Sequence, residues 1–188
     1  MTRHARLHDQ LRRYAAADPL ESRHRDAMLA LLVAAEPDPF SREHFVPGHF
    51  TASCYIVDER GRLLLHHHRR LDRWLQMGGH IESTESPEAA ALREGREESG
   101  LNDLVIAGGI ADLDVHAIPA GKGEPDHDHF DVRYVARTVS PERLVIDRNE
   151  SNRLEWFTLD QAAALMPGPE SQRVIGKIDR LLCKGSPS

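Results

Sequence analysis

The sequence lacks any apolar stretch long enough to cross a membrane. Its longest uninterrupted apolar run, residues 27–35, falls far short of the ~20 residues that a membrane-spanning helix needs. With 40% hydrophobic and 29% charged residues, the chain is nevertheless too apolar to remain disordered. The length of 188 residues therefore indicates one globular domain with a small extension, and membrane spanning is excluded.

Cysteine and basic charge are also scarce. Two cysteines, Cys54 and Cys183, cannot form the disulfide framework of a small secreted protein. Met1 is followed by Arg3 and Arg6 rather than by the apolar core of a signal peptide, so we expect a cytoplasmic protein. With 24 Lys and Arg against 30 Asp and Glu, the net charge is −6. Non-specific binding to nucleic acid requires clustered basic residues, so we expect no nucleic-acid partner.

The first 45 residues predict a helical extension. Leu, Ala and Arg recur at helical spacing in residues 3–17 and 20–35, and Asp18-Pro19 separates the two stretches. We expect two amphipathic helices in residues 1–45, followed by the main domain in residues 46–188 with a helix at its C-terminal end. The two N-terminal helices could also mediate a homodimer.

Beyond Phe50 the pattern changes to strands with helices between them. β-rich runs occupy residues 51–57 and 62–68, joined as a hairpin, then 75–77, 110–118, 130–139 and 154–157. One helix is expected between its N-cap Ser86 and its C-cap Gly100, and two more at residues 160–166 and 170–183. This order predicts an α/β fold in which a mixed sheet lies between helices.

Three glutamates are placed for metal binding on the helix that follows Ser86. Glu94, Glu97 and Glu98 lie at positions i, i+3 and i+4, so their carboxylates project from one face. Like charges at this spacing repel by roughly 0.2–0.5 kcal/mol per pair unless a cation lies among them. Oxygen ligands without cysteine suit Mg²⁺ or Mn²⁺. A solvated acidic helix face is the alternative, and the three glutamates alone would favour it.

The wider segment, residues 79–101, resembles the Nudix box. That pattern is Gly, five residues, Glu, seven residues, Arg-Glu, an aliphatic residue, any residue, Glu-Glu, any residue, Gly and an aliphatic residue. The matching positions are Gly79, Glu85, Arg93, Glu94, Glu97, Glu98, Gly100 and Leu101. The seven fixed residues of this set, leaving aside the aliphatic Leu101, should coincide by chance about once per million chains. Gly95 departs from the aliphatic position, and we expect it to let the helix lie closer to the sheet.

Resemblance to the Nudix hydrolase (MutT-like) family implies a Nudix α/β/α sandwich and a pyrophosphohydrolase acting on acid anhydrides. The implied reaction is divalent-metal-dependent cleavage of a pyrophosphate bond in a nucleoside diphosphate linked to another moiety. Its implied partners are a small-molecule nucleotide substrate and the cofactor Mg²⁺ or Mn²⁺. Intervening cations would also reconcile an anionic substrate with a chain of net charge −6.

The resemblance also implies a role for each matched residue. In Nudix enzymes the carboxylates corresponding to Glu94, Glu97 and Glu98 hold the metal, helped by a backbone carbonyl at the position of Gly79. The residues corresponding to Glu85 and Arg93 steady the loop against the helix. Glu94 and Glu97 are both candidates for the general base. A further carboxylate is expected from a later loop, where Glu150 and Glu155 remain equal candidates.

Histidine is unusually frequent, with 12 residues in the chain. Strict alternation along one expected strand places four polar residues on the same face: His127, His129, Asp131 and Arg133. The preceding strand also carries a histidine, His116. A hairpin register guessed from parity sets His116 opposite His127, Asp114 opposite His129 and Asp112 opposite Asp131. We expect a His/Asp floor beside the carboxylate helix that holds a further metal or a phosphate. A solvated polar hairpin is an equal alternative.

Two residues next to the box are further candidates for substrate contact. His80 lies inside the loop and is well placed to meet a substrate phosphate. Trp74 could stack on a base, although a tryptophan at this position is more often a packing anchor.

Two other functions are compatible with the resemblance. One is a catalytically weak Nudix module that senses a nucleotide, and the other is a prenyl-diphosphate isomerase-like enzyme. The intact acidic positions argue against the first, and the complete Arg-Glu and Glu-Glu pairs argue against the second.

Overall fold

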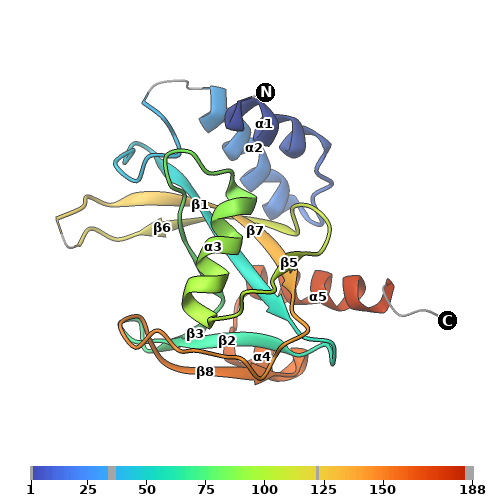
Figure 1. The fold of residues 1–188 in the computed structure, drawn as a ribbon. Coiled ribbons are helices and arrows are strands. Elements are labelled where there is room, and N and C mark those ends of the chain that lie inside the picture. The colour runs from blue at the N-terminus through green and yellow to red at the C-terminus, as the bar shows by residue number, and fades with distance from the viewer. Residues whose placement is uncertain (1, 34–36, 122, 185–188) are drawn as a thin grey trace.

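The structure is a computed structural model that describes residues 2–33, 37–121 and 123–184. Its elements follow the chain in this order (Figure 1): α1 (Arg3–Arg13), α2 (Pro19–Val33), β1 (Gly48–Val57), β2 (Leu63–His68), β3 (Arg73–Leu75), β4 (Met77–His80), α3 (Pro87–Ser99), β5 (Val105–Ile106), β6 (Asp112–Ile118), β7 (His127–Arg137), β8 (Ser151–Phe157), α4 (Leu159–Leu165) and α5 (Pro169–Lys184). The expected helices and the longer strands are confirmed. Residues 34–35 of the second expected helix lie outside the described residues.

The sheet is built around the parallel pair β1 and β7, which are in register from Gly48 and Asp128 to Val57 and Arg137. On its other side β1 pairs with β4 and with the start of β2, while β7 pairs with β5 and β6. Strand β2 pairs antiparallel with β3 and β8. The expected hairpin of β1 and β2 forms over only two residue pairs, because β4 occupies the same edge of β1 from Thr51 to Cys54.

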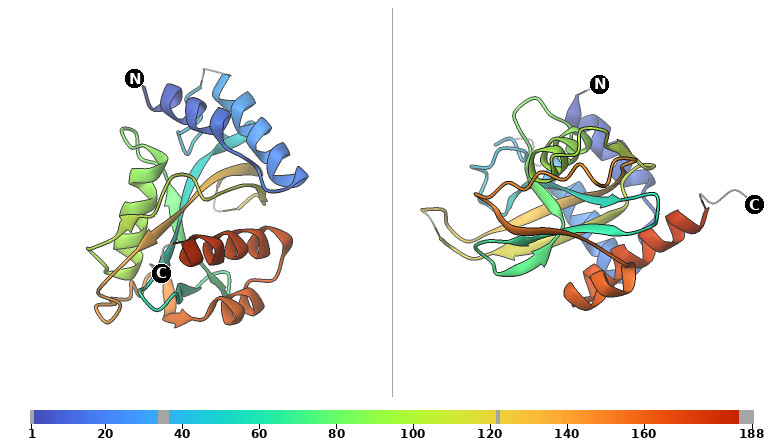
Figure 2. Two further views of the ribbon diagram at one scale, coloured as in Figure 1. Left: turned by 90° about the vertical axis from the view of Figure 1, so that its right-hand side faces the viewer. Right: turned by 60° about the horizontal axis from the view of Figure 1, so that its bottom comes forward.

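Helices cover both faces of the sheet, as the left view of Figure 2 shows for α3 and α5. The even-numbered residues of β1, from Phe50 to Ile56, pack against Ala90 and Ala91 of α3 in one core cluster. The odd-numbered Tyr55 and Val57 belong to a second cluster with residues of α4 and α5. Alternate residues of β1 therefore belong to two hydrophobic cores, one on each face of the sheet. The expected α/β/α sandwich with a mixed sheet is confirmed.

The N-terminal helices close one edge of this sheet. Glu21 of α2 accepts a hydrogen bond at 3.2 Å from the backbone N–H of Leu113, and His24 accepts one at 3.3 Å from that of Val115. Lys177 of α5 donates to Glu21 from the other side. Strand β6 thus has its free backbone groups covered by helix side chains, which protects an exposed sheet edge. The division at residue 45 stays a prediction.

The hairpin of β6 and β7 forms, but its expected register is wrong by two residues. The observed pairs are Asp112 with Arg133, Asp114 with Asp131, His116 with His129, and Ile118 with His127. A shift of two preserves which side chains share a face, so the alternation holds. The guessed register opposed Asp112 to Asp131, a pair that would call for a cation. The observed register opposes Asp114 to Asp131 and places the guanidinium of Arg133 beside Asp112.

Among the described residues, no helix has both the length and the apolar character needed to span a membrane.

Candidate active site

Helix α3 carries the glutamates and lies very close to the sheet. Ser86 caps its start by accepting a hydrogen bond at 3.2 Å from Ala89 N–H, and Gly100 ends it with φ +74°, a left-handed conformation that favours glycine. A Cβ added to Gly95 would lie 3.0 Å from both Cys54 Sγ and Leu104 Cδ1. The expectation that Gly95 permits a close approach is confirmed by this contact.

Arg93 connects the helix to the loop before it. Its guanidinium donates to both oxygens of Glu85 at 3.0 and 3.2 Å, and to the backbone carbonyl of His80 at 2.9 Å. It also donates to Glu94 at 2.9 Å and to Glu97 at 3.0 Å. One planar cation therefore holds three carboxylates and the loop backbone in a fixed arrangement.

The carboxylates of α3 differ in their exposure. Glu98 is buried, and its Oε2 accepts a 3.3 Å hydrogen bond from Gly78 N–H. Glu94 is mostly buried against Gly79, where an added Cβ would lie 2.5 Å from a carboxylate oxygen, so a larger residue would require the Glu94 side chain to shift. The side chain of Glu97 is 60% exposed. The glutamate face thus runs from the sheet out to solvent.

Burial and crowding leave these acids poorly compensated. Burial, together with the carboxyl groups of Glu150 and Glu94, raises the pKa of Glu98 to about 9. Burial also raises the pKa of Glu94, although the adjacent Arg93 opposes that change. Buried carboxyls with raised pKa values and only oxygen donors fit a hard divalent cation such as Mg²⁺ or Mn²⁺, which would replace the missing positive charge.

The structure distinguishes the two candidates for an additional carboxylate. Glu150 contacts the carboxyl group of Glu98 and also acts on the charge of Glu94. Glu155 instead forms an ion pair with Arg153 on β8. Glu150 is therefore the residue that the fold brings to the glutamates of α3.

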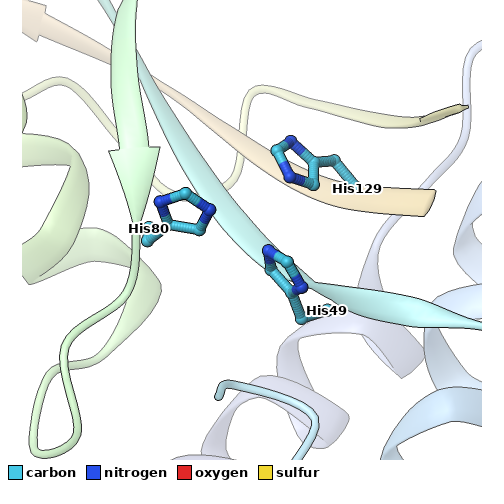
Figure 3. Close-up of side chains that lie close together, drawn as sticks. All are labelled: His49, His80 and His129. Atoms are coloured by element: carbon cyan, nitrogen blue, oxygen red, sulfur yellow. The ribbon is translucent and has the colours of Figure 1, made fainter. Parts of the chain in front are cut away.

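Histidines gather on the opposite face of the sheet. His49 of β1, His80 of β4 and His129 of β7 point toward one another (Figure 3). Their ring centroids are 4.8 Å apart for His49 and His129, 5.1 Å for His49 and His80, and 5.5 Å for His80 and His129. His127 and His116 surround them, with centroids 5.2 and 5.6 Å from that of His129.

Burial keeps this cluster uncharged. Together with the neighbouring imidazoles, it lowers the pKa of His49 to about 4 and that of His129 to about 2. Burial and the charge of Arg42 also lower the pKa of His80.

The expected His/Asp floor exists but does not lie beside α3. Side chains of β1 that face α3 are even-numbered, whereas Thr51 and Ser53 donate hydrogen bonds to Asp131 at 3.3 and 2.8 Å. The floor is therefore on the other face, a position that depends on the pairing of β1 with β7. The expected placement of this floor beside α3 is therefore wrong.

Asp131 and Arg133 are engaged within the protein. Arg133 is buried and donates to Asp131 at 2.9 Å, to Asp112 at 3.3 Å and to Asp114 at 2.7 Å. Trp74 lies apart from both clusters, packing edge-on against Phe157 at 4.8 Å between ring centroids. A substrate contact by these residues or by the histidines stays a prediction.

His49 is the residue that sequence reasoning missed. It precedes the recognisable strand pattern, and its nearness to His129 comes from the parallel pairing of β1 and β7. Parallel partners are far apart in sequence, so local spacing carries no signal for them.

The chain matches one family model, and its fold is similar to those of several solved structures. The family model described as NUDIX domain matches residues 47–177. A solved NUDIX-family hydrolase from Clostridium perfringens shares 28% identity with this chain, covering 75% of this chain and 99% of its own, with a TM-score of 0.55. An Ap4A hydrolase from C. elegans shares 19% identity, with coverages of 72% and 98% and a TM-score of 0.58. The dihydroneopterin triphosphate pyrophosphohydrolase of E. coli shares 18%, with coverages of 70% and 95% and a TM-score of 0.56.

Proposed function

This chain belongs to the Nudix family and is a pyrophosphohydrolase acting on acid anhydrides. On this basis we propose which bond of which class of substrate it cleaves. The proposed reaction is divalent-metal-dependent hydrolysis of the pyrophosphate bond in a nucleoside diphosphate linked to another moiety. The observation that carries this proposal is the meeting of Glu94, Glu98 and Glu150 beside Gly79, with too little positive charge to balance them.

The proposed cation ligands are the carboxylates of Glu94, Glu97 and Glu98 and the backbone carbonyl of Gly79. Nudix enzymes generally use divalent cations, and the oxygen donors here favour Mg²⁺ or Mn²⁺. When bound, the cation supplies positive charge to the diphosphate and Lewis acidity to the reaction. Without it, a protein of net charge −6 would repel this substrate.

The protein's own groups have two proposed tasks. Arg93 and Glu85 keep the carboxylates in place, because four of the contacts that order them pass through one guanidinium. Glu94 or Glu97 accepts the proton of the attacking water. Glu97 has the more open position, while the raised pKa of Glu94 brings it closer to the working range of a base at neutral pH.

A substrate panel tests the proposal. The full chain is incubated with ADP-ribose, NADH, nucleoside triphosphates, Ap4A and dihydroneopterin triphosphate, each with Mg²⁺, Mn²⁺ or a chelator, and the products are separated by chromatography. We expect cleavage of at least one nucleoside diphosphate derivative, abolished by the chelator. Binding of a nucleotide without cleavage would favour a sensing module, and isomerised prenyl diphosphate in a parallel assay would favour an isomerase; either result contradicts the proposal.

A further inference from the structure

Three histidines from three different strands share one small space. His49, His80 and His129 each offer a ring nitrogen that lies within 4.8 Å of the other two (Figure 3). Around a tetrahedral ion with bonds of about 2.0–2.1 Å, ligand nitrogens are about 3.4 Å apart. The three rings therefore need to close by little more than an ångström, which side-chain rotation can supply.

The hydrogen bond of the His49 imidazole leaves the lone pair of its other ring nitrogen free. Nδ1 of His49 lies 3.3 Å from the carbonyl oxygen of His44, and because a carbonyl only accepts, Nδ1 carries the proton. Nε2 of His49 is then a buried acceptor, and it has no partner among the described residues. His49 is only 1% exposed, so an unpaired acceptor at this position is unfavourable. A backbone carbonyl that fixes the tautomer of a histidine is the usual support behind a metal ligand.

His127 repeats the same arrangement at the rim. Its Nδ1 lies 2.8 Å from the carbonyl oxygen of Pro125, and its buried Nε2 likewise has no partner among residues that the structure describes. Its ring stacks on that of His49 with centroids 5.0 Å apart. The polar space around His49 thus contains a second buried imidazole nitrogen that can accept and has no partner among the described residues.

From this geometry we propose that His49, His80 and His129 bind one Zn²⁺ ion, with the fourth position left to water or to another oxygen ligand. Imidazole nitrogens suit Zn²⁺ and related transition metals, whereas the carboxylates of α3 suit Mg²⁺ or Mn²⁺. The site is separate from the proposed carboxylate site and does not depend on it, because Gly79 faces Glu94 while the next residue, His80, faces His49.

Metal titration of the full chain tests the proposal. The protein is stripped with a chelator and titrated with Zn²⁺ against a competing chelator, and with Co²⁺, whose tetrahedral complexes absorb strongly in visible light. We expect one equivalent to bind with tetrahedral Co²⁺ bands. His80→Asn and His129→Asn, both at half-buried positions, should each weaken binding by at least about 100-fold. Zn²⁺ should raise the thermal unfolding midpoint of the wild type but not of these variants.

Two control variants locate the metal. His8→Asn, at a half-buried histidine of α1, should bind as the wild type does. Glu97→Gln should keep the tight Zn²⁺ equivalent. Absence of stoichiometric binding, or binding that survives both His80→Asn and His129→Asn, overturns the proposal, as does an equivalent that Glu97→Gln abolishes. Circular dichroism of each stripped variant shows whether it is folded, and His49→Asn serves as the third ligand variant if either of the others is not.

Discussion

Arg93 joins Glu85 through two hydrogen bonds, from Nε to Oε1 at 3.0 Å and from Nη2 to Oε2 at 3.2 Å. The same guanidinium reaches Glu94, Glu97 and the carbonyl of His80. A lysine would keep the charge but could not donate in a planar fork. The arrangement of the proposed cation ligands therefore depends on this one side chain.

We predict that Arg93→Lys lowers kcat/KM by at least about tenfold, or about 1.4 kcal/mol, and the free energy of unfolding by about 1–2 kcal/mol. Steady-state kinetics and urea denaturation measure the two effects. Arg96→Lys is the matched control, because Arg96 is exposed one turn away and makes one 3.4 Å contact with Leu104. Equal kinetics for the two variants would contradict the role of Arg93.

Glu97→Gln should lower the rate by about 10²–10³, or roughly 3–4 kcal/mol of transition-state stabilisation. Its side chain is 60% exposed, so unfolding free energy should change by less than about 0.5 kcal/mol. Glu88→Gln, at an exposed position in the first turn of the same helix, should leave the rate unchanged. An unaltered rate in Glu97→Gln would refute the metal-site assignment.

Glu150→Gln and Glu155→Gln separate the two later carboxylates. Glu150 contacts Glu98, whereas Glu155 is paired with Arg153. We expect Glu150→Gln to weaken Mg²⁺ binding and lower kcat/KM by about tenfold, and Glu155→Gln to change both by less than about twofold. Activity measured over a range of Mg²⁺ concentrations gives both quantities, and a larger effect of Glu155→Gln would reverse the assignment.

Gly95→Ala tests the close packing of α3 on the sheet. Alanine gains about 1 kcal/mol of helix propensity, but its Cβ would meet Cys54 and Leu104 at 3.0 Å, and overpacking costs roughly 1–3 kcal/mol. We expect a net loss of up to about 2 kcal/mol in urea denaturation, reduced when Cys54→Ala is added. Gly176→Ala in α5 is the control, because its nearest neighbour is a flexible arginine tip at 3.8 Å, and it should stabilise the protein by about 0.5–1 kcal/mol. Equal stabilisation by both alanines would exclude the packing explanation.

Asp114 should make stability depend on pH in the acidic range. Burial raises its pKa, but the hydrogen bond from His116 and the charges of Arg133, His116 and His24 outweigh burial and lower it from 3.8 to about 2. Asp131 is the other charged group facing it, across the strand pair. Because the folded pKa lies below the unfolded one, Asp114 stabilises the fold above about pH 4, by about 2 kcal/mol, and loses this contribution as the pH falls toward 2.

Urea denaturation of the wild type and Asp114→Asn at pH 7, 4 and 3 measures this dependence. The difference in unfolding free energy should be smaller at pH 3 than at pH 4, because Asp114 becomes protonated in the folded protein as the pH falls toward 2. Asp126→Asn, at an exposed loop position, should show no such change. A difference that stays constant down to pH 3 would contradict the coupling.

The sequence alone predicted the helix with its glutamates and the order of strands and helices around it. Ser86, Glu94, Glu97 and Gly100 follow one another within a single helix, so their relative positions depend only on helix geometry and capping. Even the contact made by Gly95 was foreseeable, because a glycine at an aliphatic position leaves room for a neighbour. Alternation likewise assigned the polar residues of β7 to one face.

Only the tertiary structure decided which distant residues meet. The register of β6 and β7 is degenerate with respect to alternation, since a shift of two residues keeps every side chain on its face. The parallel pairing of β1 with β7 placed His49 against His129 and moved the polar floor away from α3. The contact of Glu150 with Glu98 arose in the same way. Local spacing determines which side chains share one face of a helix. Strand pairing and loop closure bring together residues that are distant in sequence, and the number of residues between them does not indicate that they are in contact.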